Sequence, residues 1–205
     1  MHHRRLAAVV AKPNTLTGVH DGMTSSGTPP SPPGVVLRAA RESELALAVD
    51  IDDDAGTAYA DAGLPLLLAL DDPFVVSELA RWSESARAGR MLFACAPDES
   101  AIGFSAVGFV DGRPHLEQLS VRRSWMRRGV GRLLVERAIQ WSAAEGELWL
   151  TTYAHIPWNR PWYERLGFLQ VSEQACGPEL RATLEAERRA LPAPEQRTAM
   201  CYRHR

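Results

Sequence analysis

The chain has 205 residues, 45% of them hydrophobic, and its formal net charge at pH 7 is −2. This length and hydrophobic content suit one globular domain with a sizeable core. The near-neutral charge argues against a protein that binds nucleic acid through a broad basic face, and the absence of any apolar run near 18 residues argues against a membrane span.

The cysteines indicate a reducing environment. Cys95, Cys176 and Cys201 are odd in number and widely spaced, which fits neither a disulfide framework nor a zinc site. Reduced thiols are typical of the cytoplasm. The first residues, MHHRRLAAVVA, contain an apolar run that is too short for a secretory signal peptide. We therefore expect a cytoplasmic protein without membrane attachment.

Residues 1–34 differ in composition from the rest of the chain. They are rich in glycine, serine, threonine and proline, and they end in TPPSPPG. Such a segment buries too little apolar surface to offset the chain entropy that folding costs. We therefore divide the chain into a flexible N-terminal tail, residues 1–34, and a folded domain, residues 35–205.

Apolar periodicity and turn residues predict alternating strands and helices after the tail. The aspartates at residues 52–54 lack the glycine turn and the alternating ligand spacing of a calcium loop, so we interpret them as a solvated helix end. The element order predicts an α/β (α+β) protein, with a mixed sheet of about seven strands and helices on both faces. Strands are expected at residues 35–38, 91–96, 101–110, 116–121, 148–153, 168–171 and 198–203, and helices at residues 41–51, 72–88, 130–141, 158–166 and 179–190.

The most informative stretch spans residues 116–141. A short strand pattern, LEQLSV, is followed by the basic turn RRGVGR and then by an amphipathic helix. The free N–H groups and the macrodipole at a helix start attract anions, glycine lets an anion approach the backbone, and arginines add charged donors. The stretch therefore predicts a pyrophosphate site made by Arg127, Arg128, Gly129, Val130, Gly131 and Arg132.

Two common phosphate-binding motifs are excluded here. No Gly-Lys-Ser/Thr follows the turn, so it is not a Walker A loop, and Leu134 occupies the third glycine position of a dinucleotide fingerprint. An alternative is that the two glycines merely start a helix while the arginines face water. The local residues leave both interpretations open.

Two ordered motifs resemble the GNAT family of N-acetyltransferases. Residues 126–131 match its motif Q/R-x-x-G-x-G/A after a Leu-x-x-Leu-x-Val strand, although Met126 stands where Gln or Arg is usual. Residues 159–168, NRPWYERLGF, are similar to the family's Asn…Tyr-x-x-x-Gly-Phe segment. The resemblance covers residues 35–205 and implies a GNAT-like, mostly antiparallel mixed sheet.

The resemblance also implies acetyl-CoA as co-substrate. The strand residues Leu119, Ser120 and Val121 would line the pantetheine arm, with the backbone of Leu119 and Val121 pairing with it as an added strand does. Asn159 would support the arm from the other side, and a strand-edge N–H near Leu119 would stabilise the oxyanion. The turn at residues 127–132 would hold the pyrophosphate.

Catalysis of acetyl transfer needs a proton donor for the thiolate and a base for the amine. We predict Tyr163 as the acid, because a phenol pKa near 10 resembles that of a thiol; the alternative is a core aromatic residue. Glu117 is the candidate base, and strand alternation would place it on one face with His115 and Leu119. His115, His155 and water are the other candidates.

The resulting prediction is direct transfer of an acetyl group to an amine of a small molecule or peptide, without a metal or a covalent acyl-enzyme. The alternatives are a non-catalytic module that binds or senses acyl-CoA, and an unrelated phosphate-binding protein. Residues 61–70, Trp158 and Trp162 are candidates for the acceptor side, with packing as the other role for a tryptophan. The acceptor and the oligomeric state stay open, a homodimer being one possibility.

Overall fold

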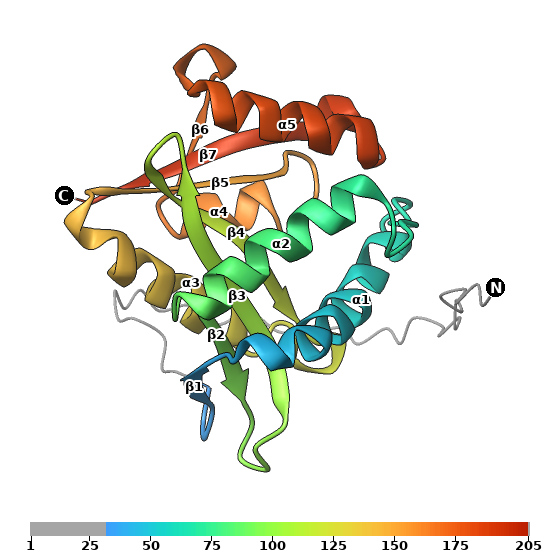
Figure 1. Ribbon diagram of the computed structural model, residues 1–205, viewed down its shortest axis with the longest axis vertical. Coiled ribbons are helices and arrows are strands. Elements are labelled where there is room, and N and C mark those ends of the chain that lie inside the picture. The colour runs from blue at the N-terminus through green and yellow to red at the C-terminus, as the bar shows by residue number, and fades with distance from the viewer. Residues whose placement is uncertain (1–31, 205) are drawn as a thin grey trace, which may run out of the picture. The chain divides into compact units, whose positions relative to one another are not determined.

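The computed structural model describes residues 32–204, so the predicted flexible tail lies almost wholly outside the described residues and stays a prediction. The described chain forms a seven-stranded sheet in the order β1-β2-β3-β4-β5-β7-β6 (Figure 1). This confirms the predicted mixed sheet. The strands are β1 (Val36–Ala39), β2 (Met91–Cys95), β3 (Ala101–Val110), β4 (Arg113–Val121), β5 (Glu147–Tyr153), β6 (Leu169–Val171) and β7 (Arg197–Arg203).

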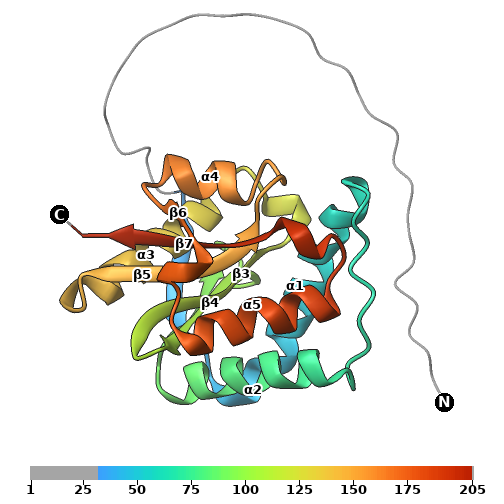
Figure 2. The same ribbon diagram turned by 90° about the horizontal axis from the view of Figure 1, so that it is seen from above.

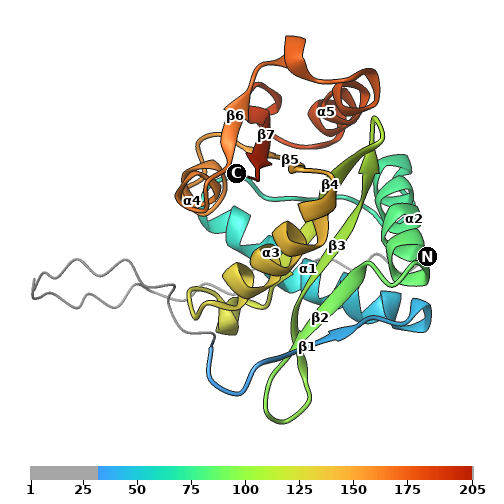
Figure 3. The same ribbon diagram turned by 90° about the vertical axis from the view of Figure 1, so that its left-hand side faces the viewer.

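Helices cover both faces of the sheet, as predicted. Clusters of buried side chains place α1 and α2 against β2 and β3, α5 against β5 and β7, and α3 and α4 on the opposite face. Figure 2 shows α4 on one side of β5 and β7, with α5 and α2 on the other, and Figure 3 shows α2 and α3 on opposite sides of β3. The helices are α1 (Leu45–Asp61), α2 (Pro73–Arg87), α3 (Val130–Trp141), α4 (Arg160–Arg165) and α5 (Pro178–Ala190).

Local sequence signals account for most element boundaries. The Asp72 side chain accepts the Phe74 N–H at 2.8 Å at the start of α2, with Pro73 in the first turn, and Gly89 follows the helix at φ +69°. Short 3₁₀ helices lie at Glu42–Glu44, Arg123–Trp125, Ser142–Ala144, Glu173–Ala175 and Pro194–Gln196.

The first helix is the main correction to the predicted elements. We expected it at residues 41–51, but α1 ends at Asp61. Ala55 and Ala58 are buried and continue the apolar stripe of Ala48 and Ile51. The aspartates at residues 52–54 therefore lie in the middle of a helix, not at a solvated end.

The strands β4 and β5 form the single parallel pair of the described sheet. Their register contains one pair, His115 with Trp149, whereas β5 and β7 pair along seven positions from Glu147 to Tyr153. Beyond His115 the β4 and β5 backbones therefore separate and leave a gap between them. Two neighbouring strands that part in this way expose backbone donors and acceptors inside a sheet.

Two further features bear on the predictions from composition. The three cysteines are buried and free. None of the helices in the described part of the chain is long and apolar enough to cross a lipid bilayer.

Candidate functional site

The gap between β4 and β5 is bordered by unpaired backbone groups of β4. The Arg122 N–H donates to the Ile102 carbonyl of β3 at 2.8 Å, so residue 122 directs its backbone groups toward β3. Backbone direction alternates along a strand, so Ser120 shares the direction of Arg122, while Leu119 and Val121 direct theirs into the gap. The two residues predicted to pair with the pantetheine arm therefore direct their backbone groups toward β5, where the ladder between the described strands gives them no partner.

A β-bulge in β4 changes which side chains share a face. Ala106 pairs with Gln118 and the next residue, Val107, pairs with Leu116, so Glu117 is the extra residue. Glu117 and Gln118 both point toward the helices α1 and α2, and Leu119 packs on the α3 side. The prediction that Glu117 and Leu119 share a face is wrong, because alternation fails at a bulge.

The turn before α3 has the backbone geometry of an anion site. Arg127 and Gly129 have φ of +62° and +88°, and Gly129 is the N-cap of α3. Val130, Gly131 and Arg132 occupy the first helical turn, whose N–H groups have no intrahelical acceptor. N–H groups without an intrahelical acceptor, together with the helix dipole, attract an anion at this end.

The arginines of the turn differ in how they are engaged. Arg132 donates to Glu136 at 2.6 Å, while Arg128 lies over the Trp125 ring at 5.2 Å. Among the described residues, Arg127 and Arg128 have no carboxylate within ion-pair distance, and both side chains are exposed. Two guanidinium groups are therefore available to a ligand at the start of α3.

The turn, the gap and α4 meet at Gly131. A Cβ atom at this position would lie 3.6 Å from Trp162 of α4 and 3.7 Å from Val121 at the end of β4. Trp162 is partly buried in the core beside Leu116 and Val135, so it has the packing role. The first turn of α3 therefore adjoins both the open end of β4 and the helix that carries Tyr163.

Tyr163 is a buried residue whose hydroxyl makes no hydrogen bond within residues 32–204. Its ring packs against Trp162 and Phe168, with centroids 4.9 and 5.4 Å away. Burial raises the pKa of Tyr163, and the nearby Tyr59 raises it further. The phenol is therefore protonated at neutral pH, the state that an acid catalyst requires.

Asn159 and Tyr59 connect α4 to α1. Asn159 is buried, and its side-chain Nδ2 and Oδ1 lie 3.0 and 3.2 Å from the Tyr59 hydroxyl. The Tyr59 ring lies 5.8 Å from that of Tyr153 and 6.0 Å from that of Trp158, of which 42% is exposed. Sequence reasoning missed Tyr59, because the predicted helix ended before it.

Glu117, the predicted base, lies beneath α2. Its Oε2 is 2.7 Å from the Ser85 hydroxyl, and the same hydroxyl lies 2.8 Å from the Val107 carbonyl. A hydroxyl has one proton, so both contacts are hydrogen bonds when Ser85 donates to the carbonyl and a protonated Glu117 donates to Ser85. Burial raises the pKa of Glu117, which favours that neutral form.

The two candidate histidines lie in different surroundings. His115 is buried on the α2 side, and neither ring nitrogen has a hydrogen-bond partner among the residues that the structure describes. Burial, followed by the Arg81 charge, lowers its pKa to about 3. His155 is exposed in the segment before α4, with its ring 5.9 Å from that of Tyr153. Of the two, His155 is the one open to solvent near the aromatic residues.

Asp52 is a carboxylate of this region that the sequence predictions did not include. Its Oδ1 accepts hydrogen bonds from Ser120 Oγ and Gln118 Nε2, both at 2.5 Å. Burial raises the pKa of Asp52, and these two hydrogen bonds lower it. The sequence could have indicated that Asp52 lies inside a helix, because the apolar positions beside it continue from Ile51 to Ala58.

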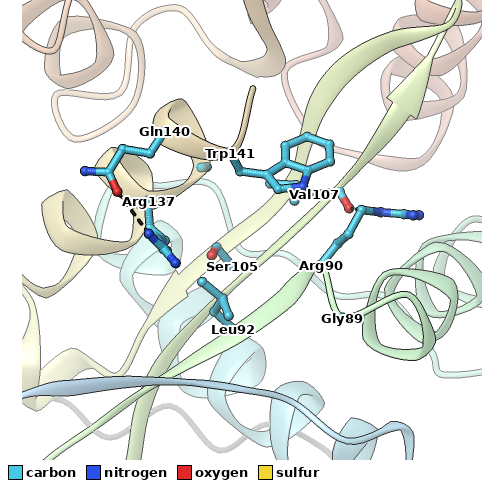
Figure 4. A pocket seen from close by; sticks show the side chains of 9 residues that line it. Gly89, Arg90, Leu92, Ser105, Val107, Arg137, Gln140 and Trp141 are labelled. Atoms are coloured by element: carbon cyan, nitrogen blue, oxygen red, sulfur yellow. Dashed lines mark hydrogen bonds between the residues drawn. The ribbon is translucent and has the colours of Figure 1, made fainter. Parts of the chain in front are cut away.

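A cavity of about 330 Å³ lies apart from these groups, between the C-terminal end of α3 and strands β2 and β3 (Figure 4). Leu92, Ser105 and Trp141 line it, and Arg137 turns toward Gln140. None of the predicted site residues lines this cavity. Within the described residues, no three His, Cys, Asp or Glu side chains are grouped as metal ligands.

Comparison with known proteins gives one matching family. Residues 64–168, just over half of the chain, match the model described as the acetyltransferase (GNAT) family. The matched segment includes the bulged β4, the turn before α3, and Tyr163.

Several solved structures share the fold. A GNAT-family acetyltransferase from Staphylococcus aureus has a TM-score of 0.61 at 10% identity, over 82% of this chain and 98% of that one. The PaiA N-acetyltransferase of Thermoplasma acidophilum, solved with coenzyme A, has a TM-score of 0.54 at 14% identity, over 83% and 99%. N-acetylglutamate synthase of Neisseria gonorrhoeae, solved with coenzyme A and N-acetyl-glutamate, has a TM-score of 0.57 at 15% identity, over 83% of this chain but 35% of the synthase.

Proposed function

This chain belongs to the acetyltransferase (GNAT) family, and we propose that it transfers the acetyl group of acetyl-CoA directly to an amine of a small molecule or peptide. One observation carries the proposal: the open end of β4, the anion-attracting start of α3 and the Tyr163 helix meet at Gly131. A long ligand with a diphosphate at one end and a thioester at the other fits such a line of groups.

The proposed ligand contacts follow from the directions of the backbone groups. Leu119 and Val121 would hydrogen-bond the pantetheine arm inside the gap, much as a neighbouring strand does. The α3 turn would bind the diphosphate through the N–H groups of residues 129–132 and through Arg127 and Arg128. Asn159 would contact the arm from α4. Ser120 would not pair with the arm as Leu119 and Val121 do, because its backbone groups point toward β3 and its hydroxyl donates to Asp52.

Acetyl-CoA supplies the activated acetyl group as a thioester. The Leu119 N–H would stabilise the oxyanion that forms when the amine attacks the carbonyl carbon. A C–N bond forms and the C–S bond breaks, and Tyr163 would give its proton to the departing sulfur. The attacking nitrogen loses one proton as it becomes an amide. A proton returns through solvent to the Tyr163 phenolate, so the residue is ready for another cycle.

A direct assay tests this proposal. Purified protein is incubated with acetyl-CoA and a panel of amines, free coenzyme A thiol is measured, and acetylated products are identified by mass. We expect thiol release that depends on the amine and matches the product in amount. Thiol release that is independent of amine would indicate hydrolysis, and no release with any amine despite bound coenzyme A would contradict the proposal.

The second candidate is a module that binds or senses acyl-CoA without catalysis. The contact of Glu117 with Ser85 under α2 favours this candidate, because it engages the predicted base within the fold. The two candidates differ at Tyr163. Replacing Tyr163 with phenylalanine slows an enzyme, whereas a sensor keeps both its affinity for acetyl-CoA and its lack of turnover.

A further inference from the structure

Asp52 uses one carboxylate oxygen in hydrogen bonds and keeps the other without a partner in the described part of the chain. Its Oδ1 accepts hydrogen bonds from Ser120 and Gln118, and its Oδ2 has no hydrogen-bond partner among residues 32–204. No arginine of the described chain forms an ion pair with it. Both donors suit the ionised carboxylate, because it accepts hydrogen bonds from each of them.

The competing carboxylate, Glu117, is bound under α2, whereas Asp52 on α1 is bound by Gln118 and Ser120 of β4. Glu117 lies against Gly108, where an added Cβ atom would come 2.2 Å from its Oε1. Its other oxygen is engaged with Ser85 under α2. The bulge therefore separates the two side chains: it turns Glu117 into the space below α2 and presents Gln118 to Asp52.

Aromatic residues follow Asp52 along the same face of α1. Tyr59 is two helical turns further along α1, on the same face; burial raises its pKa, and the Asp52 charge adds a smaller rise. The Tyr59 ring packs beside those of Tyr153 and Trp158, and the latter is partly exposed. A carboxylate with one unpartnered oxygen, on the same helix face as an aromatic ring, suits the cationic end and the apolar body of an organic amine.

We propose that Asp52 binds the acceptor ammonium and takes its proton, and that the acceptor is a primary amine with an apolar or aromatic body and no carboxylate beside the nitrogen. This inference rests on the proposed acetyl transfer. The ammonium gives one proton to Asp52, and the nitrogen lone pair then attacks the thioester carbon. After the C–S bond breaks, Asp52 releases its proton to water, so each turnover yields one amide, one thiol and one proton.

A matched pair of acceptors tests the substrate class. 2-Phenylethylamine and L-phenylalanine share a skeleton and differ by the carboxylate beside the nitrogen. We expect kcat/KM for 2-phenylethylamine to exceed that for L-phenylalanine by at least about tenfold, because Asp52 repels the added carboxylate. Equal values, or a preference for L-phenylalanine, would overturn the proposed class.

Asp52→Asn and Glu117→Gln test the residue itself. Asp52→Asn keeps an oxygen for Ser120 and Gln118 but accepts no proton, so we expect kcat/KM to fall at least about 100-fold, with coenzyme A affinity within twofold. Glu117→Gln should stay within about threefold of the wild type. The reverse ranking of the two variants would overturn the assignment.

Ser120→Ala provides a readout that a purely structural role would not change. It removes one hydrogen bond from the ionised Asp52, so the acidic limb of the kcat/KM profile should move up by about one pH unit. The other groups whose charges reach Asp52 are Asp53 on α1 and Tyr59, and neither is altered. An unmoved limb would show that Asp52 is not the titrating group.

Binding separates this inference from the proposed function. Calorimetry of 2-phenylethylamine with coenzyme A-loaded protein should show at least about tenfold weaker binding to Asp52→Asn than to the wild type. That result supports the ammonium site. If no amine is acetylated as well, the proposed acetyl transfer is refuted but the ammonium site is not. Equal affinity of the two proteins, with both folded by thermal unfolding, would refute the site.

Discussion

The proposed catalytic role of Tyr163 requires its hydroxyl group, whereas a packing role requires only its ring. Tyr163→Phe keeps the ring contacts with Trp162 and Phe168. We expect kcat to fall by about 10- to 100-fold, while KM for acetyl-CoA stays within twofold, because only the proton donor is lost. Steady-state kinetics measure both. Tyr202→Phe is the control, since that ring also packs on Phe168, at 5.5 Å; an equal loss in the control would contradict the role of Tyr163.

His115 predicts how the protein responds to acid. Burial, followed by the Arg81 charge, lowers its folded-state pKa to about 3, below its ordinary value of 6.5. Below pH 6.5 the unfolded chain therefore binds a proton that the folded chain rejects, and stability falls by about 1.4 kcal/mol per pH unit until about pH 3. Above pH 6.5 the group contributes no pH dependence.

His115→Leu should remove that part of the acid slope. Neither ring nitrogen has a hydrogen-bond partner within residues 32–204, so leucine breaks no hydrogen bond there. Urea unfolding between pH 4 and pH 7 measures the effect. His155→Leu, at an exposed position, is the control and should keep the wild-type slope. Equal slopes for His115→Leu and the wild type would show that His115 does not cause the loss.

The identity of single site residues was partly accessible from the sequence. Tyr163 and Asn159 stand out because they belong to an ordered motif, and the structure places both on the segment that faces α1. Asp52 and Tyr59 did not stand out, because both depend on the true length of α1. A run of three aspartates resembles the solvated end of a helix unless the apolar positions after it, Ala55 and Ala58, are included in the pattern.

The turn before α3 predicts how coenzyme A binding depends on charge. Arg127→Ala and Arg128→Ala should each weaken coenzyme A about five- to tenfold at low salt and less at high salt, because exposed charges are screened. Titration calorimetry at two salt concentrations measures this. Arg137→Ala changes an exposed arginine near the other end of the same helix and should leave the affinity unchanged. Losses equal to that of the control would place the diphosphate elsewhere.

Helices and strands were predictable where the pattern was local. The strands, and the helices α2, α3 and α5, lie within a few residues of their predicted bounds, because alternation, caps and breakers act between chain neighbours. The bulge in β4 was not predictable in this way. It depends on how β3 and β4 align, and nothing in LEQLSV marks Glu117 as the extra residue.

The whole fold predicts a ligand-specific gain in stability. At a coenzyme A concentration 100 times its Kd, the folded state gains about 2.7 kcal/mol, which corresponds to an increase in Tm of about 5–10 °C for a chain of this size. Thermal unfolding with coenzyme A, ATP and NAD measures it. ATP and NAD carry phosphates without the pantetheine arm, so their shifts should be smaller. Equal shifts would point to a general phosphate site.

The sequence by itself determined the order of the elements, the mixed sheet and the two motifs, since periodicity and short motifs involve residues that are close along the chain. Only the tertiary structure decided which carboxylate Gln118 and Ser120 bind. Asp52 meets Gln118 and Ser120 across 66 and 68 residues of chain, and the bulge that turns Glu117 away arises between two strands. Such contacts depend on how distant segments pack, and the local sequence pattern does not specify that packing.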